Sequence, residues 1–486
     1  MVFSSLIFLY GFFSISLLCC SLCRNRRAQN TVLLIFSLIF YSWGEPRYVF
    51  LLMAMAMSSW VCALGIRRAG SPVHRRLWLI AAAVTDIGLI GWFKYAGLLC
   101  SVFGPVPAFI RNIALPIGIS FYTFQLLTYV VDVYRGEAEA QESYWNVLLY
   151  AALFHQCIAG PIVRYSSIDR ELFSGGPRTP EWAPGVSRFC AGLAKKVLLA
   201  NPCGALADAL ILSAGTAADP GSFAANFQAL STQSVLGSWV GMIAYCLHIY
   251  LDFSAYSDMA IGMGRMLGLH YPENFNYPYV SRSIQEFWRR WHMTLGSFFR
   301  DYVYIPMGGS RCAWYRTIFN SLVVWALTGL WHGASWNYVV WGLYFFVLLM
   351  LERFCIRRPL EKLPVLSHLY LLTAVLLGFV IFRFTDMRLG LCLIRSLFGL
   401  NGNPLTDFAS LVQLKSNLFL LAAAVIASTP LAKLLGRHLQ TLAMASSSAR
   451  TLFRIGFYSL LPVVLLLLST ACLVGDSYNP FIYFQF

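Results

Sequence analysis

The chain has 486 residues, of which 58% are hydrophobic and 12% are charged, and its formal net charge is +15. This composition excludes a large soluble protein and predicts one that crosses a membrane several times. The basic residues lie in short loops between apolar stretches instead of forming a stripe, so membrane topology explains the charge and no nucleic-acid partner is expected.

Apolar stretches of spanning length recur from one end of the chain to the other. They lie at 1–23, 31–43 with 48–66, 77–95, 115–133, 147–163, 239–269, 317–351, 369–384, 418–435 and 455–473. We therefore expect an all-α polytopic membrane protein with roughly 11 to 13 membrane segments. Because no stretch resembles a soluble domain, residues 1–486 are predicted to form a single integral-membrane domain.

The first apolar stretch, Met1 to Cys23, has the composition of a secretory signal but the wrong flanks. Its basic cluster, Arg24, Arg26 and Arg27, follows the apolar residues instead of preceding them, so the segment should remain attached as a membrane helix. The positive-inside rule then places the N-terminus outside and the cluster in the cytoplasm. Other basic segments expected on the cytoplasmic side are 67–76, 195–196 and 353–362.

The 13 cysteines lie mostly inside apolar segments. Cys20 and Cys23 form a Cys-x-x-Cys pair, but no second pair or histidine cluster accompanies it, so neither a metal site nor a disulfide framework is expected. The eight histidines are too dispersed for a metal-dependent acyl-chain hydroxylase or desaturase.

Two regions of the chain contain charged or titratable groups that require an explanation. In 239–269, His248 and Asp252 are four residues apart and could bond along one helix face, and Asp258 follows. These carboxylates should face the protein interior, where they either hold helices in register or serve catalysis. The segment Tyr271 to Arg316 is dense in both aromatic and charged residues, which is typical of an interfacial helix.

Within Tyr271 to Arg316, a three- and four-residue spacing predicts one amphipathic helix. Its aromatic and apolar face would contain Trp288, Trp291, Leu295, Phe298 and Tyr302, and a second face would contain Gln285, Arg289, His292, Gly296 and Arg300. Such a helix is either a lipid-surface anchor without chemistry or the wall of a site that it enters at an angle.

The run from Thr317 to Leu351 has 35 residues without Asp, Glu, Lys or Arg, and His332 lies near its middle. It is too long for one span of about 20 residues. Gly329, Gly333 and Gly342 interrupt it, which predicts two short spans or a broken helix around the histidine. An ionisable group at bilayer depth is costly unless it is used, so His332 is a candidate functional residue. The alternative is a buried histidine that bonds a neighbouring helix.

Two histidines flanked by tryptophans, His292 and His332, suggest acid-base chemistry on a neutral substrate. Burial lowers the pKa of an imidazole and keeps it neutral, which is the state that a general base requires. The residues by themselves do not name the reaction.

The sequence contains several longer motifs rich in aromatic and charged residues. They are Glu286 to Leu295 (EFWRRWHMTL), Phe298 to Pro306 (FFRDYVYIP) and Trp331 to Gly333 (WHG), preceded in the same order by 115–121, 160–162 and 251–258. These motifs resemble the signature of the membrane-bound O-acyltransferase family. Together they cover most of the chain, with a motif-rich core at about 112–352. The resemblance is to the bacterial branch that contains alginate O-acetylases and peptidoglycan O-acetyltransferases.

This resemblance implies a ring of helices around a tunnel open to both sides of a bacterial cytoplasmic (inner) membrane. His332 matches the family's catalytic histidine, and His292 its second polar active-site position. Acetyl-CoA would arrive from the cytoplasm as acyl donor, with no bound cofactor, and a polysaccharide would accept the acetyl group on the other face. Expected tunnel or substrate-binding residues are Gln285, Arg289, Arg300, Asp301, Tyr304, Trp331, Asn337 and Asp258. Membrane lipids and a periplasmic acetyltransferase or esterase-like protein are the expected partners.

The chain ends in an aromatic tail, residues 479–486. It resembles the C-terminal motif of the small membrane peptide that accompanies the D-alanylating member of the family, and Tyr483 matches the tyrosine that relays the acyl group there. A phenol with a pKa of about 10 would need an adjacent base to act as a nucleophile. The alternative is an interfacial aromatic belt.

Other functions remain open at the level of sequence. A transporter or polysaccharide exporter would also place His, Asp and Arg inside the membrane, although no inverted repeat is visible. A D-alanyl-type acyltransferase is a further alternative. Alginate, cellulose, peptidoglycan and capsular sugars all offer hydroxyl groups, so the sequence does not choose the acceptor.

Overall fold

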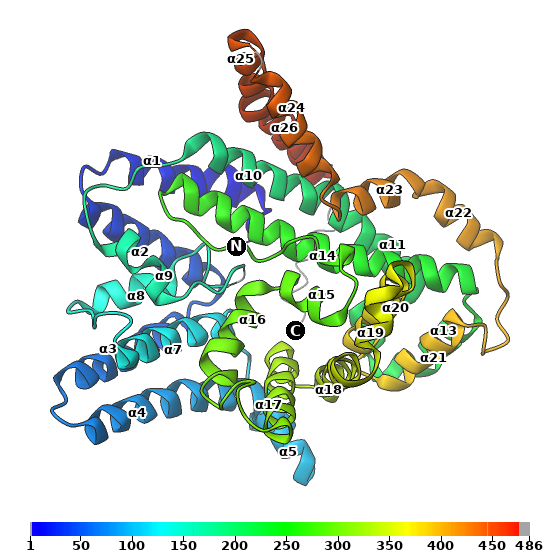
Figure 1. The fold of residues 1–486 in the computed structure, drawn as a ribbon, viewed down its shortest axis with the longest axis horizontal. Coiled ribbons are helices and arrows are strands. Elements are labelled where there is room, and N and C mark those ends of the chain that lie inside the picture. Colours follow the sequence, from blue (N-terminus) through cyan, green and yellow to red (C-terminus); the bar gives the residue numbers. More distant parts are fainter. Residues whose placement is uncertain (1, 159, 445, 476–486) are drawn as a thin grey trace. The chain divides into compact units, whose positions relative to one another are not determined.

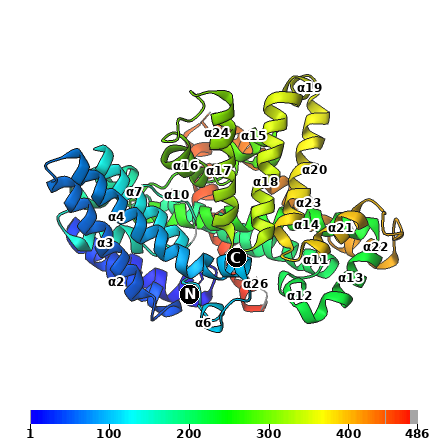
Figure 2. The ribbon, with the colours of Figure 1, turned by 90° about the horizontal axis from the view of Figure 1, so that it is seen from below.

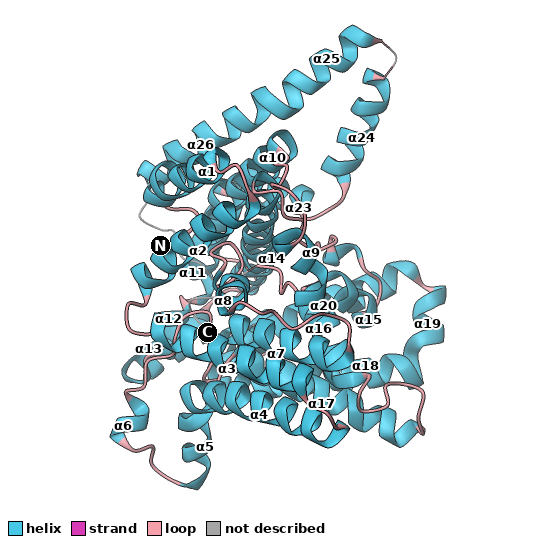
Figure 3. Cartoon of the chain, turned by 90° about the vertical axis from the view of Figure 1, so that its left-hand side faces the viewer, coloured by secondary structure: helices cyan, strands magenta, loops and turns pink. Residues whose placement is uncertain are grey.

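The computed structural model describes residues 2–158, 160–444 and 446–475, and every regular element in them is a helix (Figure 1). Coloured by secondary structure, this part of the chain contains helices and loops and no strand (Figure 3). The predicted all-α fold class is therefore confirmed. The chain divides into two compact units, Met1–Ala191 with Tyr256–Glu273, and Gly192–Ala255 with Asn274–Phe486. The predicted single domain and the predicted ring of helices around a tunnel stay predictions.

The first unit contains the N-terminal helices, several of which begin at capping residues. Its elements are η1 (Ile7–Phe13), α1 (Ser14–Leu22), α2 (Arg26–Gly44), α3 (Val49–Arg68), α4 (Pro72–Ile90), η2 (Gly91–Tyr95), α5 (Ala96–Phe103), α6 (Ala108–Arg111), α7 (Ile119–Arg135), α8 (Tyr144–Ala152), α9 (Tyr165–Phe173) and most of α10 (Trp182–Ala194). The side chain of Asn25 accepts from the Ala28 N–H and that of Ser71 from the His74 N–H, which begins α2 and α4. Helices α3, α4 and α7 pack side by side (Figures 1 and 2).

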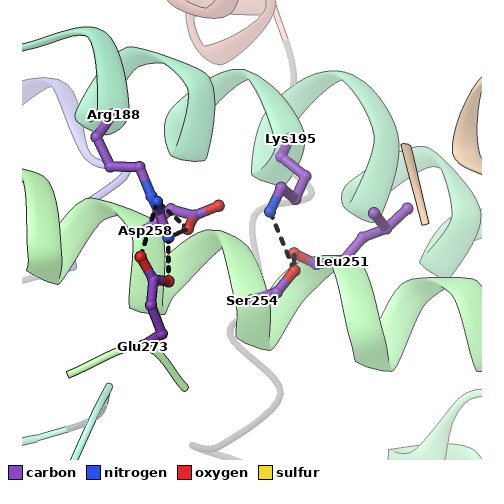
Figure 4. Close-up of polar contacts among 6 residues, drawn as sticks. All are labelled: Arg188, Lys195, Leu251, Ser254, Asp258 and Glu273. Atoms are coloured by element: carbon purple, nitrogen blue, oxygen red, sulfur yellow. Dashed lines mark hydrogen bonds and ion pairs between the residues drawn. The ribbon is translucent and has the colours of Figure 1, made fainter. Parts of the chain in front are cut away.

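Arg188 on α10 forms a charge cluster in the first unit (Figure 4). Its Nε donates to Asp258 Oδ1 at 2.7 Å, and its Nη2 lies 2.6 Å from Glu273 Oε2. The two helices approach closely at this level because Gly185 and Gly262 have no side chain: a Cβ on Gly262 would lie 2.7 Å from the Phe189 backbone N. The cluster thus satisfies Asp258 and holds the last turns of α14 against α10.

The second unit contains the long hydrophobic helices and the motif-rich segment. Its elements are the end of α10, η3 (Lys195–Ala200), α11 (Asn201–Ile211), α12 (Ala214–Ala218), η4 (Pro220–Ser222), α13 (Phe223–Thr232), α14 (Val235–Met266, whose last residues belong to the first unit), η5 (Pro278–Val280), α15 (Ile284–Arg290), α16 (Met293–Phe299), η6 (Arg300–Tyr304), α17 (Trp314–His332), α18 (Trp336–Leu351), η7 (Glu352–Ile356), α19 (Arg357–Lys362), α20 (Pro364–Arg383), α21 (Met387–Leu397), α22 (Phe408–Ser416), α23 (Leu418–Ala427), α24 (Leu431–Ala443), α25 (Ser447–Ile455), η8 (Gly456–Leu460) and α26 (Leu461–Gly475). Helix α18 packs between α17 and α20.

Polar side chains of α14 bond to η3 within the second unit. Asp252 forms a buried ion pair with Lys196, 2.7 Å long, and the Lys195 ammonium donates to Ser254 Oγ at 3.2 Å (Figure 4). His248 Nδ1 donates to the Ala200 carbonyl at 2.8 Å. These contacts connect two helices, which favours the helix-register interpretation for His248 and Asp252 over the catalytic one.

Among the described residues, six helices are long and apolar enough to cross a membrane. They are Val49–Arg68, Pro72–Phe103, Val235–Met266, Trp336–Ile356, Pro364–Arg383 and Ser447–Gly475. Phe408–Ser416 with Leu418–Ala427, bent by 55°, would make a seventh. The roughly 11 to 13 segments expected from hydropathy exceed this number because some stretches fold into shorter helices, such as the 17 residues of α7 and the 9 of α8. The polytopic architecture itself is confirmed.

Candidate active site

His332 ends helix α17 at a break in the apolar run, as the sequence predicts. Gly333 is extended, with φ −176° and ψ 160°, and α18 begins at Trp336. A Cβ on Gly333 would lie 2.3 Å from the Tyr338 ring, so the connection leaves no room for a side chain there. The sharp connection turns α18 back against α17 and keeps the imidazole at the end of the hairpin.

The expectation that Gly329 and Gly342 also interrupt the run was wrong. Both lie inside helices, Gly329 in α17 and Gly342 in α18. A Cβ on Gly329 would lie 2.3 Å from the Tyr338 carbonyl oxygen, and one on Gly342 would lie 2.4 Å from that of Trp325. These glycines therefore allow the two helices to pack with their backbones in contact, a known use of small residues between membrane helices.

The His332 ring lies in a box of aromatic side chains from three helices. Its centroid lies 4.9 Å from Trp331 on α17, 4.9 Å from Trp341 on α18 and 5.1 Å from Phe382 on α20, each edge to face. The residue is 8% exposed. Rings that pack on several sides fix the orientation of an imidazole, which a proton-transfer group requires.

Asn337 holds one wall of this box. It is fully buried, and its Nδ2 donates to the Ile381 carbonyl at 3.2 Å and the Phe382 carbonyl at 3.1 Å. Because these carbonyls lie near the end of α20, the amide fixes the Phe382 ring next to His332. The predicted role of Asn337 in lining the substrate path stays a prediction, and these bonds show that it positions the end of α20.

The predicted single amphipathic helix around His292 was wrong. The segment folds as α15, α16 and η6, and the chain leaves the helical conformation at Trp291 and His292. His292 is left-handed, with φ 44° and ψ 53°, a conformation that non-glycine residues seldom adopt. Partners that precede the predicted helix compensate for the break: Asn276 N donates to the Arg290 carbonyl, and Met293 N to the Asn274 carbonyl, both at 2.9 Å. The spacing of residues along one helix could not show this break, because it depends on hydrogen bonds to residues that precede the helix.

The break gives His292 a defined tautomer. The Thr294 N–H and Oγ1 both donate to Asn274 Oδ1, which identifies that atom as the oxygen, and His292 Nδ1 lies 3.0 Å from it. Nδ1 therefore carries the proton, and Nε2 of the neutral ring carries a lone pair with no hydrogen-bond partner among the described residues. His292 lies outside the candidate spans, and burial, with the nearby His332, lowers its pKa well below the usual value.

Trp331 contacts both histidines. Its ring centroid is 5.5 Å from that of His292 and 4.9 Å from that of His332. Two residues 40 positions apart in sequence thus flank one buried indole. The structure brings together three predicted site residues, His292, Trp331 and His332. It adds Asn274, Trp341 and Phe382, which no local sequence signal indicates.

Four other predicted residues line one cavity of about 860 Å³ in the second unit. They are Gln285, Arg289, Arg300 and Tyr304, and the wall also includes Arg282, Glu286, Trp325, Glu352 and Arg353. Arg300 is paired with Asp301 at 2.6 Å. Among the described residues, no carboxylate pairs with Arg282, Arg289 or Arg353 through its guanidinium. The cavity wall therefore carries three guanidinium groups that no described carboxylate pairs with, together with the acidic residues Glu286, Glu352 and Glu361.

A layer of tryptophan rings connects the cavity wall with His332. Trp325 lines the cavity, its ring lies 6.3 Å from that of Trp341, and Trp341 contacts His332. Trp288 contacts both Trp325 and Trp341, at 5.1 and 5.4 Å. The indole N–H groups of Trp288 and Trp341 are buried and have no hydrogen-bond partner in the part of the chain that the structure describes.

Two predicted site residues lie elsewhere. Asp258 belongs to the first unit, where Arg188 engages its carboxylate. Tyr483 and the rest of the aromatic tail lie outside the described residues. Their predicted roles stay predictions.

Comparison of the sequence with known proteins identifies the family of this chain. The profile of the membrane-bound O-acyltransferases matches residues 137–385, a segment that contains both histidines, the tryptophan layer and the cavity wall. The chain belongs to the membrane-bound O-acyltransferase family. It is therefore a multi-pass membrane acyltransferase, and the resemblance recognised in the motifs is confirmed.

Individual relatives refine the comparison. A probable alginate O-acetylase of Pseudomonas aeruginosa is 33% identical, with all of both chains covered. The peptidoglycan O-acetyltransferase of Helicobacter pylori is 29% identical over 78% of this chain and 75% of its own length. The teichoic acid D-alanyltransferase of Bacillus subtilis is 26% identical over 50% of this chain and 60% of its own.

Proposed function

We propose that this acyltransferase moves acetyl groups from cytosolic acetyl-CoA to hydroxyl groups of an extracytoplasmic polysaccharide, with His332 as general base. The observation that carries the proposal is the full-length similarity to alginate O-acetylases, combined with a buried histidine pair beside a basic cavity. The D-alanyltransferases match only 50% of the chain, whereas the alginate O-acetylase of Pseudomonas aeruginosa matches all of it. This difference favours acetyl transfer over D-alanyl transfer. The acceptor is an alginate-like exopolysaccharide or peptidoglycan.

The cavity is the proposed donor site. Its volume suits a cofactor-sized ligand, for which pockets of about 300 to 1,000 Å³ are usual. The phosphates of acetyl-CoA would face Arg282, Arg289 and Arg353, whose planar guanidinium groups match phosphate oxygens. The basic segment 353–362, expected in the cytoplasm, contributes Arg353 to this wall, so the proposed donor enters from that side.

The proposed reaction uses the donor cavity at one end of the tryptophan layer and His332 at the other. His332 removes the proton of the acceptor hydroxyl while the oxygen attacks the thioester carbonyl carbon, and the carbonyl becomes an oxyanion. The unpartnered N–H groups of Trp288 and Trp341 are the proposed donors to that oxyanion. When the intermediate collapses, the carbon–sulfur bond breaks, the CoA thiolate takes the proton from the His332 imidazolium, and the acetyl ester is complete.

His292 has the proposed role of orienting the acceptor. Its Nε2 lone pair can accept a hydrogen bond from a second sugar hydroxyl, because Nδ1 is already committed to Asn274. We propose the inner membrane of a bacterium as the location and a periplasmic esterase-like protein as a partner that discriminates between polymers. The bacterial origin of the relatives supports this assignment.

The test is turnover by the purified full chain in proteoliposomes. Release of CoA thiol from acetyl-CoA is measured with mannuronate oligomers, with peptidoglycan fragments and with no acceptor. We expect stimulation by one acceptor class and formation of its acetyl ester, and loss of both in His332→Gln. Turnover of a D-alanyl thioester with no turnover of acetyl-CoA would overturn the proposal in favour of the D-alanyl alternative.

A further inference from the structure

Arg178, in the loop between α9 and α10 of the first unit, is a buried cation with neutral partners. The residue is 6% exposed. Its backbone N–H donates to Gln29 Oε1 at 3.0 Å and its Nη1 to Asn30 Oδ1 at 2.7 Å, both on α2. These contacts account for one of the five guanidinium N–H groups.

No carboxylate pairs with Arg178 among the described residues. The charged side chain with the largest effect on the pKa of Arg178 is Arg26, which is also positive. Burial and Arg26 lower the pKa of Arg178 to about 10, so the guanidinium is still protonated near neutrality. A buried charge is costly unless it is paired, and this environment therefore lacks an anion.

Arg178 also lines a cavity with room for an anion. A cavity of about 340 Å³ is lined by Arg178, by Cys20, Ser21 and Cys23 at the end of α1, and by Trp182 and Leu267. Its wall thus combines one cation with small polar and apolar side chains. That combination suits an amphiphile with one anionic group better than a highly charged soluble ligand.

The loop that carries Arg178 is fixed by the end of α14, within the same unit. Glu181 N donates to the Arg265 carbonyl at 2.9 Å. Gly268 is left-handed with φ 71°, and a Cβ there would lie 2.8 Å from the Arg178 Cβ, so the approach requires glycine. The site is therefore built into the fold.

The surroundings of the cavity indicate where the anion comes from. Leu18 and Leu22 on α1 are exposed, as is Trp182, an aromatic residue typical of the membrane interface. The basic cluster of Arg24, Arg26 and Arg27 follows directly in the chain. In a membrane protein, such a junction of apolar helix and basic residues lies at the level of the lipid phosphates.

We propose that this cavity binds the phosphate group of a membrane phospholipid, with the Arg178 guanidinium as its counter-ion and an acyl chain along Leu18 and Leu22. The proposal goes beyond acyl transfer and is independent of it. Phosphate is shared by lipids and soluble phosphates, and apolar α1 favours the lipid.

The experiment is native mass spectrometry of the full chain purified in mild detergent and supplemented with phosphatidylglycerol. Arg178→Gln removes the cation, whereas Arg27→Gln removes an exposed arginine of the same cluster and serves as matched control. Ser21→Phe keeps Arg178 and fills the cavity from its exposed edge, which makes the test independent of the folding of Arg178→Gln. We expect occupancy by one lipid to fall at least tenfold in Arg178→Gln and Ser21→Phe and to stay unchanged in Arg27→Gln.

A parallel arm measures thermal unfolding with phosphatidylglycerol, with a neutral diacylglycerol and with inorganic phosphate. Stabilisation by phosphatidylglycerol alone, absent in Ser21→Phe, supports the proposal. Equal lipid occupancy in wild type and Ser21→Phe would overturn it. Stabilisation by inorganic phosphate alone would overturn the lipid assignment in favour of a soluble phosphate.

Discussion

His292 Nδ1 donates a hydrogen bond of 3.0 Å to Asn274 Oδ1, and this one contact decides which ring nitrogen is able to accept a proton. Asn274 is itself oriented by Thr294, so the tautomer is fixed by a small buried network. The His292 ring therefore has Nδ1 as its donor and Nε2 as its acceptor before any substrate is bound.

Removing that acceptor should impair catalysis without unfolding the protein. In Asn274→Ala the His292 ring loses its orientation and tautomer preference, and we expect a fall in kcat of about tenfold, which corresponds to about 1.4 kcal/mol. Steady-state release of CoA is the measurement. Asn320→Ala is the control, because Asn320 is equally buried and donates to the backbone carbonyls of Met307 and Gly309. An equal loss of kcat in both variants would reduce the Asn274 effect to packing.

The two histidines should differ in their contribution. His332→Gln is expected to abolish acetyl transfer while the amount of folded protein in membranes is kept, because the proposed role is proton removal. His292→Ala should retain a residual rate, since an orienting residue seldom costs as much as the base. Acetylated polymer and membrane-extracted protein are measured together, with the exposed His438→Gln as control. The opposite order of losses would exchange the two roles.

The cavity arginines should control the affinity for the donor. Arg289→Gln and Arg353→Gln are expected to raise the KM for acetyl-CoA about tenfold each, the size of a lost charge-assisted hydrogen bond, with little change in kcat. The KM of wild type should rise with ionic strength, and less so in the variants. Arg450→Gln, on α25 and away from the cavity wall, should behave as wild type. A change in kcat alone would remove these residues from the donor site.

Helix contact through glycine should determine the stability of the α17–α18 hairpin. Gly342→Ala would place a Cβ 2.4 Å from the Trp325 carbonyl, so we expect a loss of about 1 to 3 kcal/mol in the free energy of unfolding. Gly88→Ala is the control, since no atom outside its own helix lies within 4 Å of its Cβ position. Thermal unfolding in detergent compares the two. If Gly342→Ala left the free energy of unfolding unchanged, the close contact between α17 and α18 would not contribute to stability.

The tail offers a test of the acyl relay. Tyr483→Phe keeps the aromatic ring and removes the hydroxyl, so a relay predicts that transfer to polymer fails while acetyl-CoA still binds. Mass spectrometry of the C-terminal peptide should then show one acetyl group on Tyr483 of the wild type. An anchoring role predicts normal polymer acetylation by Tyr483→Phe, because the ring carries the interfacial preference.

The sequence by itself determined the all-α membrane class, the family and the two histidines. The length of a hydrophobic stretch indicates a helix buried in lipid, and a single titratable residue in an apolar run indicates a functional site. Both signals are local in the sequence. The break at Gly333 was also local, since His332 and the following helix start are adjacent in the chain. Motif order then named the family without any knowledge of the fold.

Tertiary structure alone decided how these parts meet. The left-handed turn at His292 exists because Asn274, 18 residues earlier, bonds the start of α16, and no helical periodicity encodes a partner at that distance. Gly329 and Gly342 read as breaks in sequence but serve helix contact, because only the packed hairpin shows which backbone faces them. The unpaired charge of Arg178 likewise appears only when the loop is folded, since a basic residue in a sequence does not reveal whether a carboxylate reaches it.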